Sequence, residues 1–293
     1  MINIALYIAC VLIWGTTWYA IKMQLGVVDP EVSLTYRFGL AVLILLTYAL
    51  ATHRPLRISP VDHAFAAILG ACMFSLNYAL TYYGTQYINS GLVAVLFTVL
   101  TFMNMGNERV FFGFRADWRI LTASAIGLGG VGLIFLPEIA SISSGAERVL
   151  GMGMIIAGTY LASLGNMVAI RNTRRGIRPT TMSIYGMAYG TAFLFLSAVI
   201  QGQPFIIVYS AEYLGSLLYL SVMGTAVAFV CYLELIRRIG SGRAAYTSVL
   251  IPLVALTVSA IFENYHFSPL STAGVALVLA GNALALTGRI RAN

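Results

Sequence analysis

The segment VLGMGMIIAGTYLASLGNMVAI (residues 149–170), followed by RNTRRGIRP (171–179) and TTMSIYGMAYGTAFLFLSAVI (180–200), decides the fold of this chain. Two long apolar runs flank one short loop that carries four arginines and a proline. Each run has the roughly 20 residues that a helix needs to cross a membrane. Short arginine-rich loops are typical of the cytoplasmic side. The segment therefore predicts two transmembrane helices joined by a cytoplasmic loop.

The composition of the whole chain is that of a membrane protein. Of its 293 residues, 59% are hydrophobic and 9% are charged, whereas a soluble domain carries about 25% charged residues. This composition excludes a soluble globular fold, and membrane lipid is the expected surrounding. The net charge of +7 comes from arginines in short loops between apolar runs. Membrane topology explains that pattern, so we expect no nucleic-acid partner.

Apolar runs between charges, glycines and prolines predict ten transmembrane helices, and hence an all-α integral membrane fold. Seven of the eight prolines lie at or outside the ends of these runs, where they interrupt no helix interior. Pro252 is the exception. The helices are expected near residues 4–22, 31–52, 62–83, 88–106, 117–137, 149–171, 180–200, 211–235, 242–262 and 268–288.

The basic residues predict the side of the membrane on which each loop lies. With a cytoplasmic N-terminus, the outside loops hold only Lys22 and Arg148, and Arg37 lies within the second helix. Cytoplasmic loops carry such an excess of arginine. We therefore expect a multi-pass protein of the bacterial inner membrane with both termini in the cytoplasm. The other 14 of the 17 basic residues are then inside: Arg54, Arg57, Arg109, Arg115, Arg119, Arg171, Arg174, Arg175, Arg178, Arg237, Arg238, Arg243, Arg289 and Arg291.

A weak internal repeat divides the chain into halves at residues 1–140 and 149–293. Short matches recur at an offset of 149 early in the chain and 151 later. Because each half has five helices, an odd number, the second half must enter the membrane in the opposite sense. We expect two inverted five-helix repeats around a central cavity, as in many secondary transporters. The matches are Ala20-Ile21-Lys22 with Ala169-Ile170-Arg171, Pro30 with Pro179, Tyr36 with Tyr185, Ser90-Gly91 with Ser241-Gly242, Ala94 with Ala245, and Gly130 with Gly281.

One set of motifs is spread over both halves of the chain: Trp14-Gly15, Lys22, Pro30, Tyr36-Arg37-Phe38, Ser90-Gly91, Ser241-Gly242, Pro252 and Glu263. Together these motifs resemble a known family, the EamA-type exporters of the drug/metabolite transporter superfamily. The resemblance spans the chain and is nearest to the branch that exports amino acids, including aromatic ones. It implies a ten-helix exporter whose central cavity is lined mainly by helices 1, 3, 4, 6, 8 and 9.

The fourth helix departs from the pattern of its counterpart in the second half. Thr101 stands where the second half has Pro252. The distance from Ser90 to Glu108 is also four residues shorter than that from Ser241 to Glu263. We therefore expect helix 4 to be short or broken.

No enzymatic motif is present in the sequence. It lacks a GxxxxGK[ST] phosphate loop, an HExxH zinc motif and a paired-aspartate motif for Mg-diphosphate chemistry. We expect no cofactor, metal site or catalytic residue. The alternative class is a membrane-embedded enzyme or scaffold, which would need carboxylates or histidines that converge near one membrane face. The acids here are scattered over loops.

Polar and aromatic residues within the expected cavity helices are the candidate substrate site. Such a lining suits a ligand with a flat apolar body and a small polar head, because aromatic pairs add about 0.5–1.5 kcal/mol beyond area burial. An aromatic or large apolar amino acid fits best. Hydrogen bonds between helices and interfacial aromatic belts are the alternative roles. The candidates are Trp14, Asn77, Tyr78, Tyr82, Tyr160, Ser163, Asn166, Tyr232 and Tyr246.

Arg37 and Pro252 are the candidate gating and hinge residues. Arg37 lies about two turns into helix 2, where it either contacts a substrate carboxylate or gate, or extends toward the outer interface with its charge in water. Pro252 can kink helix 9. Proton-driven carriers usually need a titratable group in the membrane core, and no acid lies clearly within a helix core. We therefore expect facilitated export, a uniport, without obligatory proton movement.

Small residues in helices 5 and 10 indicate close helix packing. They occur at residues 127–132 and again at Gly274, Ala276, Ala280 and Gly281. Small faces let membrane helices approach closely. We read both helices as packing elements that could also form a dimer face, so the expected assembly is a monomer or a weak dimer.

Overall fold

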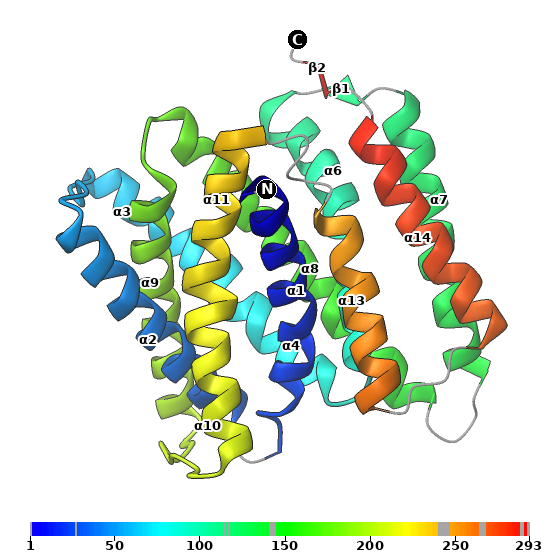
Figure 1. The fold of residues 1–293 in the computed structure, drawn as a ribbon, viewed down its shortest axis with the longest axis horizontal. Helices are drawn as coiled ribbons and strands as arrows, with labels where there is room; N and C mark the ends of the chain where they lie inside the picture. Colours follow the sequence, from blue (N-terminus) through cyan, green and yellow to red (C-terminus); the bar gives the residue numbers. More distant parts are fainter. Residues whose placement is uncertain are drawn as a thin grey trace. The chain divides into compact units, whose positions relative to one another are not determined.

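The computed structural model describes residues 2–26, 28–113, 115–116, 118–140, 145–239, 247–263, 268–287 and 290–291. Helices dominate this part of the chain (Figure 1). The first half of the chain holds α1 (Ile2–Lys22), α2 (Pro30–Ala51), α3 (Pro60–Leu69), η1 (Gly70–Leu76), α4 (Asn77–Thr85), α5 (Ser90–Phe97), α6 (Leu100–Phe112) and α7 (Trp118–Ala140).

The second half of the chain is also helical. It holds α8 (Gly145–Arg174), α9 (Pro179–Ile200), α10 (Ala211–Leu218), η2 (Tyr219–Val227), α11 (Ala228–Ile239), α13 (Thr247–Phe262) and α14 (Pro269–Thr287). Two very short strands, β1 (Arg115–Ala116) and β2 (Ile290–Arg291), pair antiparallel with Arg115 opposite Arg291.

The all-α integral membrane class is confirmed. Each of the ten predicted segments contains helix, and six helical stretches in the described residues are long and apolar enough to cross a membrane. Three further apolar helices there are shorter. The remaining predicted segment, 211–235, is the unbroken series α10, η2 and α11. The six long stretches are Ile2–Lys22, Pro30–Ala51, Pro60–Thr85, Ser90–Phe112, Gly145–Arg174 and Pro179–Ile200.

Of the two expectations for helix 4, short or broken, the structure shows the break and not the shortening. Helix α5 ends at Phe97, a turn follows, and α6 begins at Leu100. At the break, the Thr98 hydroxyl donates 2.6 Å to the carbonyl oxygen of Val95. The second piece runs beyond the predicted end at residue 106, and Gly113 closes it at a φ of 70°. That left-handed conformation favours glycine at a helix end.

Two helices contain a π-helical stretch that the apolar pattern does not predict. Helix 3 passes through η1 and helix 8 through η2. In η2 the Thr225 hydroxyl donates 2.9 Å to the carbonyl oxygen of Leu220, five residues earlier. In η1, a Cβ atom at Gly70 would lie 2.6 Å from the carbonyl oxygen of Gly186 on α9. Glycine at position 70 therefore lets the backbones of η1 and α9 approach closely.

The contacts divide the chain into two compact units, and each unit combines segments from both sequence halves. Unit 1 comprises Met1–Tyr19, Tyr83–Ile156 and Ala228–Asn293. Unit 2 comprises Ala20–Tyr82 and Ala157–Val227. The chain therefore passes from one unit to the other within α1, α4 and α8 and after η2. The division of the sequence into repeats at 1–140 and 149–293 stays a prediction.

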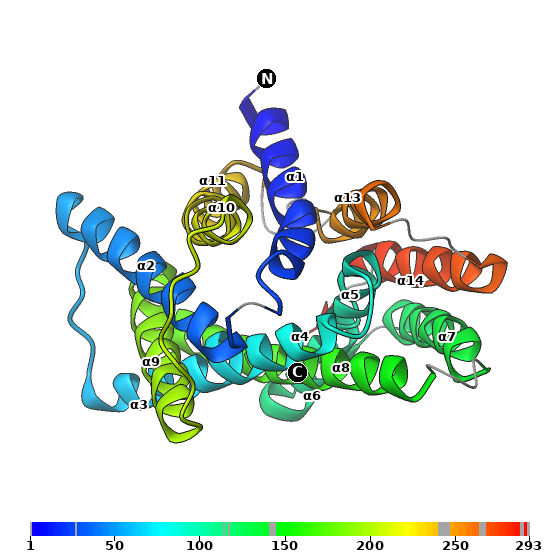
Figure 2. The same cartoon turned by 90° about the horizontal axis from the view of Figure 1, so that it is seen from below.

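Unit 2 is built around the antiparallel packing of α2 and α9, which lie side by side (Figures 1 and 2). Near the start of α2, Val32 shares a buried apolar cluster with Ala198 from the end of α9. Beyond the other end of α2, the Tyr185 hydroxyl from the first turns of α9 donates 2.8 Å to the carbonyl oxygen of Leu56. The two helices therefore run in opposite directions.

Unit 1 is built around the antiparallel packing of α7 and α14 (Figures 1 and 2). A Cβ atom at Gly130 would lie 2.6 Å from the carbonyl oxygen of Gly274, and one at Gly281 would lie 2.7 Å from that of Ala123. Only residues without a side chain fit at such distances. Gly130, Gly274 and Gly281 are therefore used for packing, as predicted, whereas a Cβ atom at Gly129 or Gly132 would meet nothing within 4 Å. The use of these helices as a dimer face stays a prediction.

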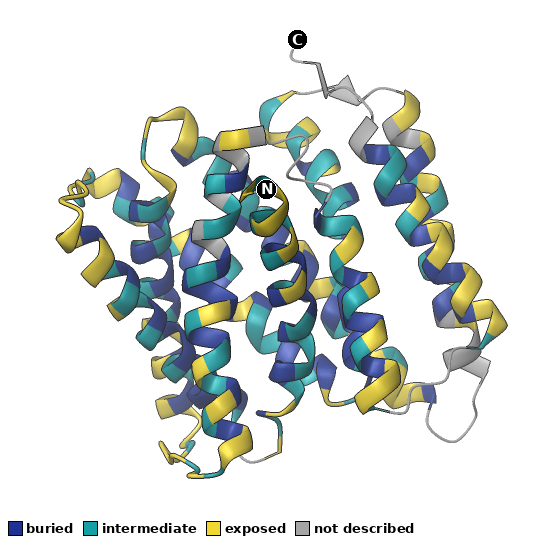
Figure 3. Ribbon diagram, in the orientation of Figure 1, coloured by how far each residue is buried: buried dark blue, intermediate teal, exposed yellow. Residues whose placement is uncertain are grey.

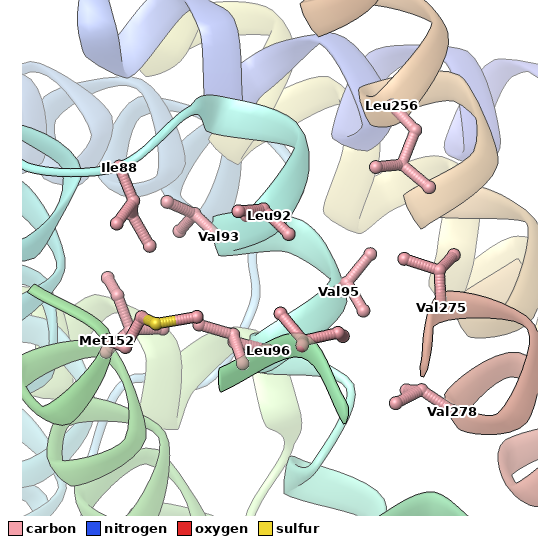
Figure 4. Close-up of a cluster of buried hydrophobic side chains, with 11 residues drawn as sticks. Ile88, Leu92, Val93, Val95, Leu96, Met152, Leu256, Val275 and Val278 are labelled. Carbon is pink, nitrogen blue, oxygen red and sulfur yellow. The ribbon is translucent and has the colours of Figure 1, made fainter. Parts of the chain in front are cut away.

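Buried and exposed residues alternate along α14 with the period of a helix (Figure 3). Its buried face carries Val275 and Val278, which join a core cluster with Leu96 and Leu256 (Figure 4). The opposite face exposes large apolar side chains such as Leu277. A helix surface that is apolar on its exposed face suits contact with lipid.

Candidate functional site

Arg37 lies at the centre of a buried cluster in unit 2. Helix α2 begins with Pro30 at its first position, and two turns later it places Arg37 with 3% of its surface exposed. The guanidinium carbon lies 4.9 Å from the centre of the Tyr78 ring and 5.3 Å from that of Phe38. Such stacking stabilises a desolvated cation by up to about 2 kcal/mol. Arg37 does not extend into water in this structure.

Tyr82 links Arg37 to a glutamine that the sequence analysis did not identify. The Tyr82 side chain is fully buried. Its hydroxyl accepts a hydrogen bond from Arg37 Nη1 at 3.4 Å and donates one to Gln24 Oε1 at 2.7 Å. Gln24 lies in the turn after α1 and is 1% exposed. A loop glutamine two residues after Lys22 carries no local signal of burial, so the apolar pattern could not identify it.

The cluster contains an arginine without a carboxylate partner among the described residues. Its only polar contact there is the long bond to Tyr82, and Arg37 Nε has no acceptor. Arginine at the centre of a membrane costs roughly 2.5–3.5 kcal/mol on insertion scales. Gln24 Nε2 is also buried without an acceptor. These unsatisfied N–H donors distinguish the cluster from an ordinary apolar core.

Asn77 directly precedes Tyr78 and lies at the junction of η1 and α4. It is 3% exposed, and its Nδ2 donates 3.2 Å to the carbonyl oxygen of Met73. Its Oδ1 atom is buried without a hydrogen-bond donor. A Cβ atom at Gly158 on α8 would lie 2.9 Å from the Asn77 carbonyl oxygen. The small residue at position 158 thus brings α8 against this polar turn.

The predicted residues of α8 do not all lie on one face. Ser163 is fully buried, and Asn166 is half-buried. Tyr160 is 47% exposed, and the structure does not place it with the other aromatic candidates of unit 2. The difference in burial separates Tyr160 from Ser163 and Asn166 on this helix.

Trp14 and Tyr232 form a separate aromatic pair in unit 1. Their ring centres are 5.1 Å apart at an interplanar angle of 61°, an edge-to-face arrangement. Nearby, the Cys10 thiol lies 4.0 Å from the carbonyl oxygen of Ala228. Tyr246, another predicted site residue, lies outside the described residues.

Pro252 is buried inside α13, where α1 packs closely against it. A Cβ atom at Gly15 would lie 2.5 Å from Val254 Cβ and 3.2 Å from the carbonyl oxygen of Ile251. Gly15 of the Trp14-Gly15 motif therefore packs against the turn of α13 that contains Pro252. A proline in a helix interior removes one backbone hydrogen bond and can kink the helix.

The end of α13 is joined to the start of α5 by a carboxylate. Glu263 Oε2 accepts a hydrogen bond from the Ser90 hydroxyl at 2.6 Å and another from the Ser90 backbone N–H at 3.0 Å. A carboxylate at a helix N-terminus satisfies N–H groups that have no partner within the helix. Ser90 and Glu263 both belong to the family-like motifs, although their contact could not be read from the sequence.

Comparison with known sequences supports the same class of protein. The EamA-like transporter family matches residues 1–136 and 149–287 of this chain. Protein PagO of Salmonella typhimurium is 22% identical over 98% of this chain and 96% of its own length. A protein of the same organism named "Probable amino-acid metabolite efflux pump" is 23% identical over 92% of this chain and 90% of its own length.

A solved crystal structure has the same fold. Its TM-score is 0.66 at 16% sequence identity, and the match covers 97% of this chain and 96% of that chain. At this identity the likeness concerns the fold alone.

Proposed function

Because the chain belongs to the EamA-like transporter family, we propose that it exports amino acids and similar small metabolites across the bacterial inner membrane. Aromatic and large apolar amino acids are the preferred substrates in this proposal. The observation that carries it is the similarity, along nearly the whole chain, to a relative named as an amino-acid metabolite efflux pump. The buried rings and amides of unit 2 suit a ligand with a flat apolar body and a small polar head.

Export proceeds by alternating access between two inverted halves. Equivalent positions in the two halves support this arrangement. Ser59 caps α3 by accepting from the Asp62 N–H, and Ser210, 151 positions later, caps α10 by accepting from the Tyr213 N–H. The π-helical stretches η1 and η2 begin 149 positions apart, at Gly70 and Tyr219.

The packing of equivalent helices supports the inverted relation. Helix α2 and its counterpart α9 pack antiparallel in unit 2, while α7 and its counterpart α14 pack antiparallel in unit 1. A two-fold axis in the membrane plane reverses one half relative to the other. Antiparallel pairs of equivalent helices are the expected consequence.

Export is a facilitated uniport without obligatory proton movement. Two buried acids of unit 2 lie at helix ends and have polar partners. Glu31 accepts from Gln201 and Gln203. Asp62 accepts from Arg171 Nη1 at 2.7 Å. A proton carrier usually needs a titratable group in the membrane core that faces both sides in turn.

Flux in proteoliposomes tests the substrate and the coupling together. Purified protein should move Phe, Trp, Leu and Thr faster than Asp and Lys, because the proposed lining is short of charge. An imposed pH gradient should drive no uphill accumulation. Preference for the charged amino acids, or no amino-acid flux, would refute the substrate assignment. Uphill accumulation driven by protons would refute the uniport.

A further inference from the structure

Two N–H groups of the Arg37 cluster are buried but have no acceptor. They are Nε of Arg37 and Nε2 of Gln24, in residues that are 3% and 1% exposed. The Tyr82 hydroxyl lies between the two side chains, since it accepts from Arg37 and donates to Gln24. Buried polar groups in proteins are nearly always hydrogen-bonded. Two donors without acceptors, one of them on the arginine cation itself, therefore point to an acceptor that binds during function.

The chemistry of the donors defines that acceptor. A guanidinium group and an amide N–H together suit an anion with two oxygen acceptors, and arginine matches the geometry of a carboxylate. The cluster holds one cation, so a phosphate with its greater charge fits it less well. The acid Glu31, six residues before Arg37 on α2, accepts hydrogen bonds from Gln201 and Gln203.

From these contacts we propose that Arg37 and Gln24 bind the carboxylate group of the transported metabolite. This inference rests on the proposed function, and it adds Gln24 to the residues of the candidate substrate site. The rings of Tyr78 and Phe38, which hold the guanidinium group, provide apolar surface beside the carboxylate. Tyr82 positions both donors.

Entry to this site requires the turn that carries Gln24 to move. Both orphaned donors are closed to solvent in this structure. This turn includes Gly26, whose φ of 81° lies in the left-handed region and at which a Cβ atom would meet nothing within 4 Å. Rotation at this glycine would withdraw Gln24 from Tyr82 and expose the Arg37 guanidinium group.

Ligand binding to the purified full-length protein tests the proposal. The probes are two matched pairs: phenylalanine with phenylalaninamide, and 3-phenylpropanoate with 3-phenylpropanamide. A charge-assisted hydrogen bond is lost in each amide, so the wild-type protein should bind each acid about tenfold or more tightly than its amide. Arg37→Gln should abolish this preference. Equal binding of acid and amide by the wild type, or a preference that survives Arg37→Gln, would overturn the proposal.

Two further variants keep the test decisive. Ser33→Ala removes the buried 3.0 Å hydrogen bond between Ser33 and Tyr213, on the same helix as Arg37, and should leave the acid preference unchanged. If Arg37→Gln does not fold, Gln24→Met removes the second donor with little change in volume and should reduce the preference severalfold. An unchanged preference in a folded Gln24→Met protein would refute the role of Gln24.

Flux measurements separate this proposal from the proposed function. A wild-type protein that prefers acids in binding but moves no solute in liposomes would refute export and retain the carboxylate site. A protein that exports amino acids with no preference for acid over amide would refute the site and retain export.

Discussion

At the scale of single residues, Gly130 sets how closely α7 approaches α14. A Cβ atom there would lie 2.6 Å from the Gly274 carbonyl oxygen, whereas one at Gly132 would meet nothing within 4 Å. We expect Gly130→Ala to destabilise the protein by about 1–3 kcal/mol, because the two backbones must separate. Thermal unfolding of the purified protein in detergent measures this change.

Gly132→Ala is the matched control, two residues away on the same helix. Its added methyl group enters open space, so its unfolding temperature should stay close to that of the wild type. Alanine is the better helix former, so equal destabilisation by both substitutions would refute the contact with α14 as the cause of the effect at position 130.

At the scale of an element, α13 is the expected hinge because Pro252 lies in its interior. Pro252 removes one hydrogen bond from the helix interior, at the level where Gly15 brings α1 into contact. A straightened helix should tilt less readily during gating. We therefore expect Pro252→Ala to lower the transport rate about tenfold, equivalent to about 1.4 kcal/mol in the barrier, with a much smaller change in substrate affinity.

Pro269→Ala provides the control for this experiment. Pro269 is the first residue of α14, where proline interrupts no interior hydrogen bond, and its replacement should leave both rate and affinity unchanged. Unchanged flux in Pro252→Ala would make Pro252 a packing feature rather than a hinge.

At the scale of the whole molecule, the distribution of arginines predicts the orientation of the chain. The native cysteines are free thiols and would first be replaced. Single cysteines near Arg174 and Arg238 should then be shielded from an impermeant thiol reagent in intact cells. Cysteines near Ser144 and Gln203 should react with it. The reverse labelling pattern would refute the orientation and, with it, the inverted repeat.

The approximate bounds of the helical segments could be predicted because they depend on local properties. Apolar runs of about 20 residues, prolines at their ends and arginines in the loops each act within a few turns of the chain. The break after Phe97 also had a local signal, the shortened distance from Ser90 to Glu108. The π-helical stretches had none, since one additional residue in a turn does not disturb an apolar run.

The sequence by itself determined a helical membrane protein of the EamA-like family and the residue types that its helices contain. Only the tertiary structure decided how those residues combine. Gln24, Arg37 and Tyr82 meet in one buried cluster, although Gln24 and Tyr82 are 58 positions apart. Tyr160, which has the same residue type and hydropathy as Tyr82, is 47% exposed instead. Hydropathy specifies whether a segment enters lipid, whereas burial depends on the neighbour that each helix face meets, and that neighbour comes from a distant part of the chain.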